Sequence, residues 1–335
     1  MKVVLKAYAL LSVLLAPGAV LAQQNSTSGV QPAAVYNGGH NGTTTVGLRI
    51  ANGGAGQSGF IGAWADSFIN YMVNRKGHEP FLVEWYLGDT TQSIAFLQQK
   101  VVDVAATYNL AAERAVYDAG LLSAWLYGWR DHFYFVGPTS NPAQLSQNDT
   151  VLTMARKIVQ VGNEQAAVPP ASGLATRFLS RYDKSATNIK ESQIFITTGQ
   201  VPWALDYSKW YHQYPRFPIQ ALEAASVLGE YTLTDRGTWL SSTTDVRSKL
   251  TIFKAGTDNE TDILLNPAHV LIAKEGNLLN ADIGKAFADW VNLYDPQNKD
   301  GGQYVAETFT GNAQSQNPQP LYTRAPGNWT PPPEA

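Results

Sequence analysis

Apolar segments of strand length alternate with amphipathic segments of helix length along most of the chain, and this alternation restricts the fold most strongly. Such alternation is typical of α/β layers, so we predict an α/β fold. In the segment 172–182 the helix prediction rests on Leu174, Phe178 and Tyr182, which are spaced by four residues. We expect strands at 45–51, 81–86, 101–106, 133–136, 158–161 and 264–273, and helices at 58–72, 90–99, 172–182 and 281–293.

The last predicted strand, 264–273, and the last predicted helix, 281–293, look like a return of the chain to the first lobe. We therefore expect lobe I to combine residues 44–138 with 259–309, and lobe II to be the insertion 139–258. Two chain crossings between lobes give the hinge of a clamshell binding protein. The polar segment 23–43 reads as a flexible leader, and the proline-rich segment 310–335 as an extended tail.

The first residues have the pattern of a secretory signal peptide. Lys2 and Lys6 precede a short apolar run, Pro17 and Gly18 follow it, and Ala22 offers a small residue before the expected cleavage. The run is shorter than a membrane-spanning helix, and no later segment is apolar enough to span a membrane. We expect residues 1–22 to be removed and the mature protein to be secreted and extracellular.

The chain has no cysteine, so it has neither disulfides nor the cysteine that carries a bacterial lipid anchor. Its stability must come from core burial, and chains of about this size bury about 75% of their unfolded surface. The five N-glycosylation sequons favour a secreted eukaryotic glycoprotein, fungal in our interpretation. These sequons begin at Asn25, Asn41, Asn148, Asn259 and Asn328.

The formal net charge is −3 and no basic run occurs, which argues against nucleic acid or anionic membranes as partners. We expect a monomer that binds a small ligand.

One polar, glycine-containing run is the string Tyr231-Thr232-Leu233-Thr234-Asp235-Arg236-Gly237-Thr238. It resembles a segment of the tungstate-binding proteins of bacterial ABC uptake systems. Read alone, the run fits a turn stabilised by Asp and Thr side chains. The resemblance implies a two-lobed periplasmic-binding-protein fold of type II and binding of an oxyanion such as tungstate or molybdate.

Further motifs in the same order extend this resemblance over most of residues 45–309. The apolar strand that ends in Val-Gly-Pro, the Trp-Tyr pair, the Asn-Pro pair and the late Gly-Gln pair are similar to the family's. They lie at 132–138, 210–211, 266–267 and 302–303.

In open α/β sheets, ligands bind beyond the carboxyl ends of strands, where helix N-termini offer unpaired N–H groups and a positive dipole end. Loops after the predicted strands therefore supply the candidate ligand residues, although glycine turns and Ser or Thr caps occur at any such junction. The candidates are Gly56, Gln57, Ser58, Gly59, Thr90, Thr91, Tyr108, Asn109, Ser172 and Thr176.

The family also carries an arginine shortly before a Ser-Gly-Thr-His sequence in the second lobe. The nearest match that we find is Ser172-Gly173, which lacks the arginine and follows Glu164, a residue of the wrong sign. Arg177 and Arg216 are the candidates to supply the positive charge instead.

Aromatic residues between Trp203 and Tyr214 fall at helical spacing, which favours core packing. If this stripe faced the cleft, a sugar, amino acid or small organic acid would be the ligand. The dinucleotide fingerprint at 54–59 has its acidic partner, Glu84, in mid-strand, so an oxidoreductase is disfavoured.

The sequence around Ser58 lacks the last glycine of a hydrolase nucleophile motif, and the five histidines have no metal-ligand spacing. We expect no enzyme, no cofactor, no catalytic residue and no metal site.

Overall fold

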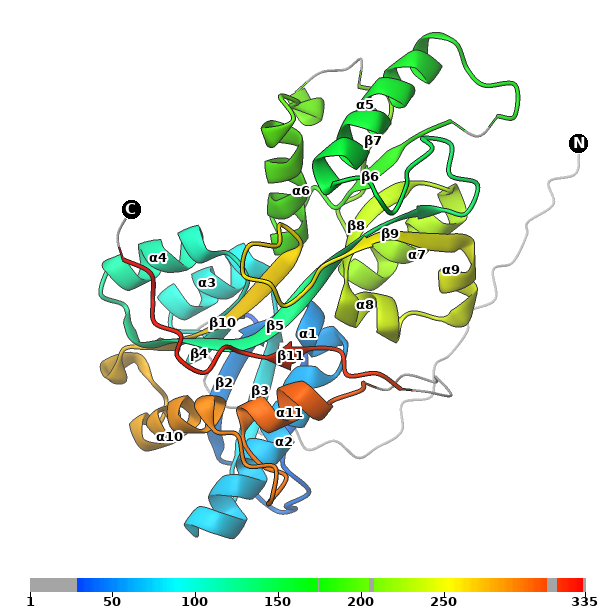
Figure 1. Cartoon of the computed structure of the whole chain (residues 1–335). Helices are drawn as coiled ribbons and strands as arrows, with labels where there is room; N and C mark the ends of the chain where they lie inside the picture. The colour runs from blue at the N-terminus through cyan, green and yellow to red at the C-terminus, as the bar shows by residue number, and fades with distance from the viewer. Residues whose placement is uncertain (1–28, 174, 205–207, 312–317, 334–335) are drawn as a thin grey trace, which may run out of the picture. The chain divides into compact units, whose positions relative to one another are not determined.

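The computed structural model describes residues 29–173, 175–204, 208–311 and 318–333, and residues 31–335 form one compact unit. In this unit the chain folds as a mixed α/β protein with two lobes joined by a shared strand, as the sequence predicts (Figure 1). The predicted signal peptide and Asn25 lie outside the described residues. Among the helices of the described residues, none is both long and apolar enough to cross a membrane.

The shared strand is β5, Leu122–Pro138, and it is far longer than the strand expected at 133–136. Its first half pairs antiparallel with β10, and its second half pairs antiparallel with β8 and β9. The second crossing runs back from β9 to β10, where Leu264 O accepts from Phe133 N at 2.8 Å. The strand order is β1-β3-β2-β4-β10-β5-β8-β6-β7, and β9 and β11 also pair with β5.

Lobe I surrounds one apolar cluster that contains Trp64, Trp129 and Trp290, each at most 1% exposed. Its strands are β1 Ala34–Tyr36, β2 Val46–Asn52, β3 Leu82–Leu87, β4 Val104–Thr107, β10 Leu265–Ala273 and β11 Thr323–Arg324. Its helices are α1 Gly54–Gln57, α2 Phe60–Asn70, η1 Tyr71–Arg75, α3 Thr90–Gln98, α4 Leu110–Asp118, η3 Glu275–Asn277, α10 Ala281–Asn292 and α11 Gly302–Thr308.

Lobe II surrounds a second cluster that contains Phe135, Phe178 and Trp210. Its strands are β6 Phe178–Ser180, β7 Tyr211–Gln213, β8 Tyr231–Asp235 and β9 Leu250–Ala255. Its helices are α5 Val151–Ala167, α6 Ala186–Thr197, η2 Pro202–Ala204, α7 Pro218–Leu228, α8 Arg236–Ser241 and α9 Thr244–Lys249. The residue boundaries predicted for the lobes stay a prediction.

Two elements of lobe II differ from the sequence prediction. The strand expected at 158–161 lies inside α5, because Met154 and Ile158 are buried at helical spacing and Thr150 caps the helix by accepting from Thr153 N. The prediction of a helix at 172–182 is also wrong. Phe178 instead begins the three-residue strand β6, which inserts between β7 and β8. A strand this short shows no period of its own in the sequence.

Two members of the predicted aromatic stripe, Trp203 and Trp210, do not share a helix. Trp203 lies in η2, whereas Trp210 directly precedes β7, which begins at Tyr211. Trp210 is 2% exposed and packs in the lobe II cluster, and Trp203 packs against that cluster. A third member, Tyr207, lies outside the described residues. Trp203 and Trp210 therefore pack with the core, the arrangement that the sequence favours.

Both predicted loose ends also contribute to lobe I. In the leader, β1 pairs with β3, and Gly38 N donates to Asp66 Oδ1 at 2.9 Å. In the tail, β11 pairs with β5, and Leu321 and Tyr322 are 0% and 1% exposed. The described parts of these segments are thus packed rather than flexible.

A buried polar network holds the loop between β6 and α6. The Ser180 hydroxyl donates to Glu191 Oε1, which also accepts from Asn188 Nδ2 at 2.8 Å. Tyr211 Oη donates to Ser180 Oγ at 2.7 Å, and Tyr182 N donates to the same oxygen at 3.1 Å. Burial of Glu191 raises its pKa to about 8, although the hydrogen bonds from Ser180 and Asn188 oppose the shift.

This raised pKa predicts a pH dependence of stability. The native state keeps the proton of Glu191 up to about pH 8, whereas the unfolded chain releases it near 4.5. The free energy of unfolding should therefore fall as pH rises from about 5 to 8, by up to about 1.4 kcal/mol per pH unit from this group. Glu191→Gln, which mimics the protonated acid, should remove this contribution in urea unfolding measured across that range.

The matched control is Glu223→Gln, because Glu223 is exposed on α7. Its stability curve should follow that of the unaltered protein. Parallel curves for Glu191→Gln and the unaltered protein would show that Glu191 is ionised in the native state.

Candidate functional site

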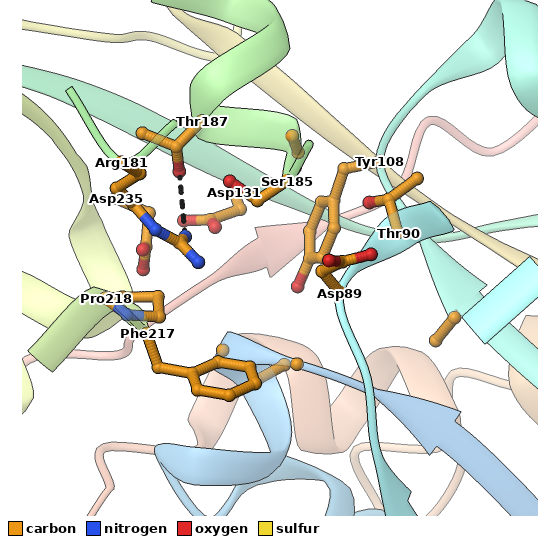
Figure 2. A pocket seen from close by; sticks show the side chains of 15 residues that line it. Asp89, Thr90, Tyr108, Asp131, Arg181, Ser185, Thr187, Phe217, Pro218 and Asp235 are labelled. Atoms are coloured by element: carbon orange, nitrogen blue, oxygen red, sulfur yellow. Dashed lines mark hydrogen bonds between the residues drawn. The ribbon is translucent and has the colours of Figure 1, made fainter. Parts of the chain in front are cut away.

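A cavity of about 40 Å³ lies between the lobes, beyond the carboxyl ends of β2, β4, β6 and β8 (Figure 2). One water needs about 10–15 Å³ in the same measure, so there is room for a few waters or one small ion. The lining residues are Gly53, Gly54, Ala55, Asp89, Thr90, Ala106, Tyr108, Asp131, Arg181, Ser185, Ala186, Thr187, Phe217, Pro218 and Asp235.

Three helices of nine or more residues, α3, α6 and α7, begin at this cavity. The first amides of a helix have no intrahelical partner and carry the positive end of the dipole. Ser185 Oγ caps α6 by accepting from Asn188 N, and the amides of Ala186 and Thr187 precede that bond in the first turn. Gly54 and Ala55 open the short helix α1 on the facing wall. The arrangement suits a small anion.

Two carboxylates at the cavity act as helix caps. Asp89 Oδ1 accepts from Gln92 N at 2.8 Å at the start of α3. Asp235 accepts from Thr238 N at 2.7 Å and from Thr238 Oγ1 at 2.6 Å at the start of α8. The Asp-Arg-Gly-Thr motif therefore forms the junction between strand β8 and helix α8. Asp235 caps α8 and also lines the cavity.

The other charged member of the motif, Arg236, points elsewhere. Its Nε and Nη2 donate to Pro320 O at 3.1 and 2.9 Å and so fasten the tail. A Cβ on Gly237 would lie 2.6 Å from Tyr322 Oη, which explains why this position has no side chain. Both residues hold the C-terminal segment against the hinge.

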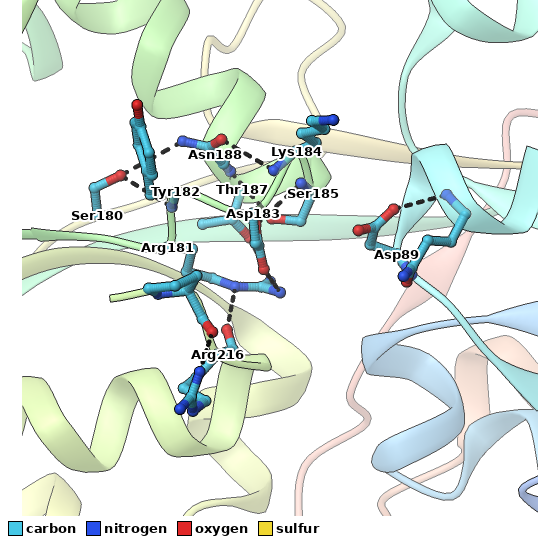
Figure 3. A network of polar contacts seen from close by, with 12 residues as sticks. Asp89, Ser180, Arg181, Tyr182, Asp183, Lys184, Ser185, Thr187, Asn188 and Arg216 are labelled. Atoms are coloured by element: carbon cyan, nitrogen blue, oxygen red, sulfur yellow. Dashed lines mark hydrogen bonds and ion pairs between the residues drawn. The ribbon is translucent and has the colours of Figure 1, made fainter. Parts of the chain in front are cut away.

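Arg181 is the cation of the cavity, and its guanidinium points into it (Figure 2). It is 5% exposed, follows β6 directly, and is held on three sides (Figure 3). Nη2 donates to Asp183 Oδ2, Nε donates to Arg216 O at 3.1 Å, and Nη1 donates to Thr187 Oγ1 at 3.4 Å. Tyr182 and Lys184 in this loop have φ angles of 45° and 64°, a strained conformation that often marks functional loops.

Asp131 lies at the floor of the cavity on β5 and is 2% exposed. Burial, together with the nearby charge of Asp235, raises the pKa of its carboxyl well above the usual range. The hydrogen bond from His132 N opposes this shift. A protonated Asp131 adds no negative charge to the cavity and offers one more O–H donor.

Of the candidates expected from the sequence, Thr90 and Tyr108 line the cavity. The other candidates do not line it, although the strand-one loop reaches it through Gly53, Gly54 and Ala55. The candidates away from the cavity are Gly56, Gln57, Ser58, Gly59, Thr91, Asn109, Ser172, Thr176, Arg177 and Arg216.

Packing explains several of these displacements. A Cβ on Gly56 would lie 2.1 Å from Trp85, so this glycine lets α1 approach the sheet rather than a ligand. Ser58 Oγ donates to Ala55 O and contacts Tyr322 Oη at 3.1 Å, so it faces the tail. Asn109 Oδ1 caps α4 by accepting from Ala112 N at 2.9 Å.

Neither arginine proposed from the sequence supplies the charge. Arg177 precedes β6 at the end remote from the cavity and pairs with Glu230 at 3.1 Å. The Arg216 side chain is exposed and donates to Pro215 O, and only its carbonyl contacts Arg181.

Lobe II places at the cavity an arginine that is not among the candidates from the sequence. Arg181 lies on the loop after β6, shortly before Ser185, Ala186 and Thr187 at the start of α6. The predicted helix at 172–182 would put Arg181 inside an element instead of on a loop after a strand.

Among the described residues, no group of three or more His, Cys, Asp or Glu side chains could hold a metal ion. The three cavity aspartates do not form such a group, since Asp89 and Asp235 are occupied as caps.

Comparison with known proteins agrees with this architecture. A periplasmic protein of solved structure, proposed to bind metal, is 45% identical with a TM-score of 0.75, over 88% of this chain and 99% of that one. The tungstate-binding protein TupA of Peptoclostridium acidaminophilum is 27% identical over 232 residues, which are 67% of this chain and 73% of that protein.

The structure of the tungstate-binding protein TupA of Desulfovibrio alaskensis G20 shares the fold. Its TM-score is 0.62 at 22% identity, over 84% of this chain and 99% of that one. The sequence model of the PBP superfamily domain matches residues 37–292. The chain therefore belongs to the PBP superfamily, the fold of solute-binding proteins.

Proposed function

We propose that the cavity between the lobes binds a small tetrahedral oxyanion such as tungstate or molybdate. The observation that carries this proposal is the convergence of the N-termini of α3 and α6, the first residues of α1 and the buried guanidinium of Arg181 on a cavity of about 40 Å³. Backbone amides and a fixed guanidinium supply donors from several directions, as a tetrahedral anion requires.

The relatives support the same ligand class. Two of them are tungstate-binding proteins. In this chain Arg181, Ser185 and Thr187 of lobe II line the cavity and offer a cation and two hydroxyl groups. Asp89 and Asp235 oppose a dianion, but each caps a helix N-terminus, and burial raises the pKa of Asp131 towards the neutral acid.

In mechanism, the ligand bridges both lobes. Gly54, Ala55 and Thr90 contact it from lobe I, and Arg181, Ala186 and Thr187 from lobe II. An anion held from both sides stabilises the closed arrangement, because its affinity for that arrangement is higher. We infer that the protein is a binder rather than an enzyme.

The second candidate is a small organic ligand, such as a sugar or an amino acid, in the same cleft. The acceptor oxygens of Asp89 and Asp235 favour it, because hydroxyl or ammonium groups would donate to them. The cavity volume disfavours it, since organic-ligand pockets usually measure about 300–1,000 Å³.

We further infer that the protein is exported and glycosylated, from the signal-peptide pattern of residues 1–22 and the sequons. Asn41, Asn148, Asn259 and Asn328 are all exposed, so each is accessible to glycosylation.

Tungstate should raise the melting temperature of the unaltered protein, since it binds the native state. Arg181→Ala should weaken tungstate binding about 100-fold or more, because losing one partner of a buried charge pair costs about 3–5 kcal/mol. Isothermal titration calorimetry measures the affinity. Arg177→Ala and Arg216→Ala are the matched controls and should bind as the unaltered protein does.

The ligand panel also includes molybdate, sulfate, phosphate, glucose and glycine. A response to glucose or glycine alone would replace the oxyanion by the organic ligand. Undiminished tungstate binding in Arg181→Ala would remove Arg181 from the site.

Export and glycosylation are tested by the intact mass of protein collected from the medium of a eukaryotic secretion host. We expect a chain that begins at Gln23 and carries glycans at one or more of Asn41, Asn148 and Asn259. A sugar-free mass that includes residues 1–22 would contradict this inference.

A further inference from the structure

A second and much larger cavity, of about 760 Å³, lies on the other side of Tyr108 and Ala186, the two residues that it shares with the cleft. Its walls come from α4, α6, the hinge strands β5 and β10, and the C-terminal tail. In Figure 1 the red tail runs across β5 towards α4. Trp329, Pro332 and Pro333 of this tail line the cavity. The volume falls within the range of pockets for organic ligands.

Much of this wall is apolar or aromatic. Phe133 and Leu265 line it from the hinge, and Tyr127 and Trp329 line it beside α4. Trp329 packs edge-to-face on Tyr127 with 5.8 Å between ring centroids, and it stacks on His269 at 4.8 Å. These rings provide a flat surface for a planar ligand.

One hydrogen-bond donor at this wall, Arg114 Nη2, is buried without a partner among the described residues. Arg114 contacts Asp118 through Nη1, at 3.4 Å, and its guanidinium lies 5.4 Å from the centroid of the Trp125 ring. A buried donor without an acceptor is unfavourable, so this atom is suited to a ligand that brings an acceptor oxygen.

A second cation, Lys190 on α6, lines the same cavity. Burial lowers the pKa of its ammonium group, with partial compensation from Asp262, and no described carboxylate lies within ion-pairing distance of it. The cavity's own acids are already engaged. Glu260 pairs with Arg130 at 2.8 Å, and Asp262 accepts from Thr257 N and Leu264 N.

We propose that this second cavity is a binding site for an organic acid with a planar apolar body, whose carboxylate is held by Lys190 and Arg114 and whose body packs beside Tyr127 and Trp329. Lys190 and Arg114 have cationic groups that are not fully paired, so they favour an anionic ligand. The aromatic walls and the volume select an organic body over an inorganic ion. The site is separate from the oxyanion cleft, so it stands whichever ligand the cleft binds.

The test uses the full mature chain and two matched probes, indole-3-acetate and its neutral analogue indole-3-acetamide, in isothermal titration calorimetry. The unaltered protein should bind the acid saturably and at least tenfold more tightly than the amide, because charged hydrogen bonds at a partly buried site are strong. Lys190→Met should reduce that preference at least tenfold, Arg114→Gln should also reduce it, and Lys190→Arg should restore it.

Lys274→Met serves as the control, because Lys274 is exposed and remote from the lining residues. Its acid and amide affinities should equal those of the unaltered protein. Indole-3-acetate should still bind saturably, at one molecule per chain, in the presence of saturating tungstate, which separates this site from the cleft. The proposal is overturned if the acid shows no saturable binding, if acid and amide bind equally, or if Lys190→Met keeps the full preference.

Discussion

The structure depends on the antiparallel pairing of β5 with different partners along its two halves. Residues Leu122–His132 bond to β10 in lobe I, and residues Phe133–Pro138 bond to β8 and β9 in lobe II. The change of partner falls between His132 and Phe133, two residues after Asp131, so the hinge and the floor of the cleft belong to the same short segment. Any rotation of the lobes must therefore change the surroundings of Asp131, a buried acid with a raised pKa.

Near that hinge, the positive potential in the cleft comes from helix N-termini more than from cationic side chains. Arg181 is the one described arginine or lysine that lines the cleft, and it already contacts Asp183. The remaining positive potential comes from the N-terminal turns of α3, α6 and α7. Asp89 caps α3 and Asp235 caps α8, so each carboxylate is offset by a helix N-terminus.

The sequence predicted much of lobe I and less of lobe II, for a physical reason. In lobe I, long elements such as α2 show a clear helical period, with Phe60, Trp64 and Phe68 all buried on one face. In lobe II, β6 and β7 have three residues each, too few to show a period. The described parts of the leader and the tail are packed, although the sequence predicted a flexible leader and an extended tail. Tertiary contacts such as that of Arg236 with Pro320 hold them in place.

The difference in how well the two lobes are predicted also explains which candidate residues line the cavity. Loop positions that follow well-predicted strands, such as Thr90 and Tyr108, do line the cavity, whereas Arg181 was missed because its strand was missed. Gly56 and Ser58 carried the right composition for an anion loop, but packing against Trp85 and Tyr322 decides their orientation. No local pattern in the sequence could show those distant partners.

The central claim is that an oxyanion sits where Arg181 meets the helix N-termini. Anomalous diffraction at the tungsten L-III edge, from crystals grown with sodium tungstate, locates the ion directly. The account predicts one strong peak in the cleft, within hydrogen-bonding distance of the Arg181 guanidinium and of backbone amides at the start of α1 or α6. A cleft without a tungsten peak, or a peak confined to a surface away from Arg181, would contradict it.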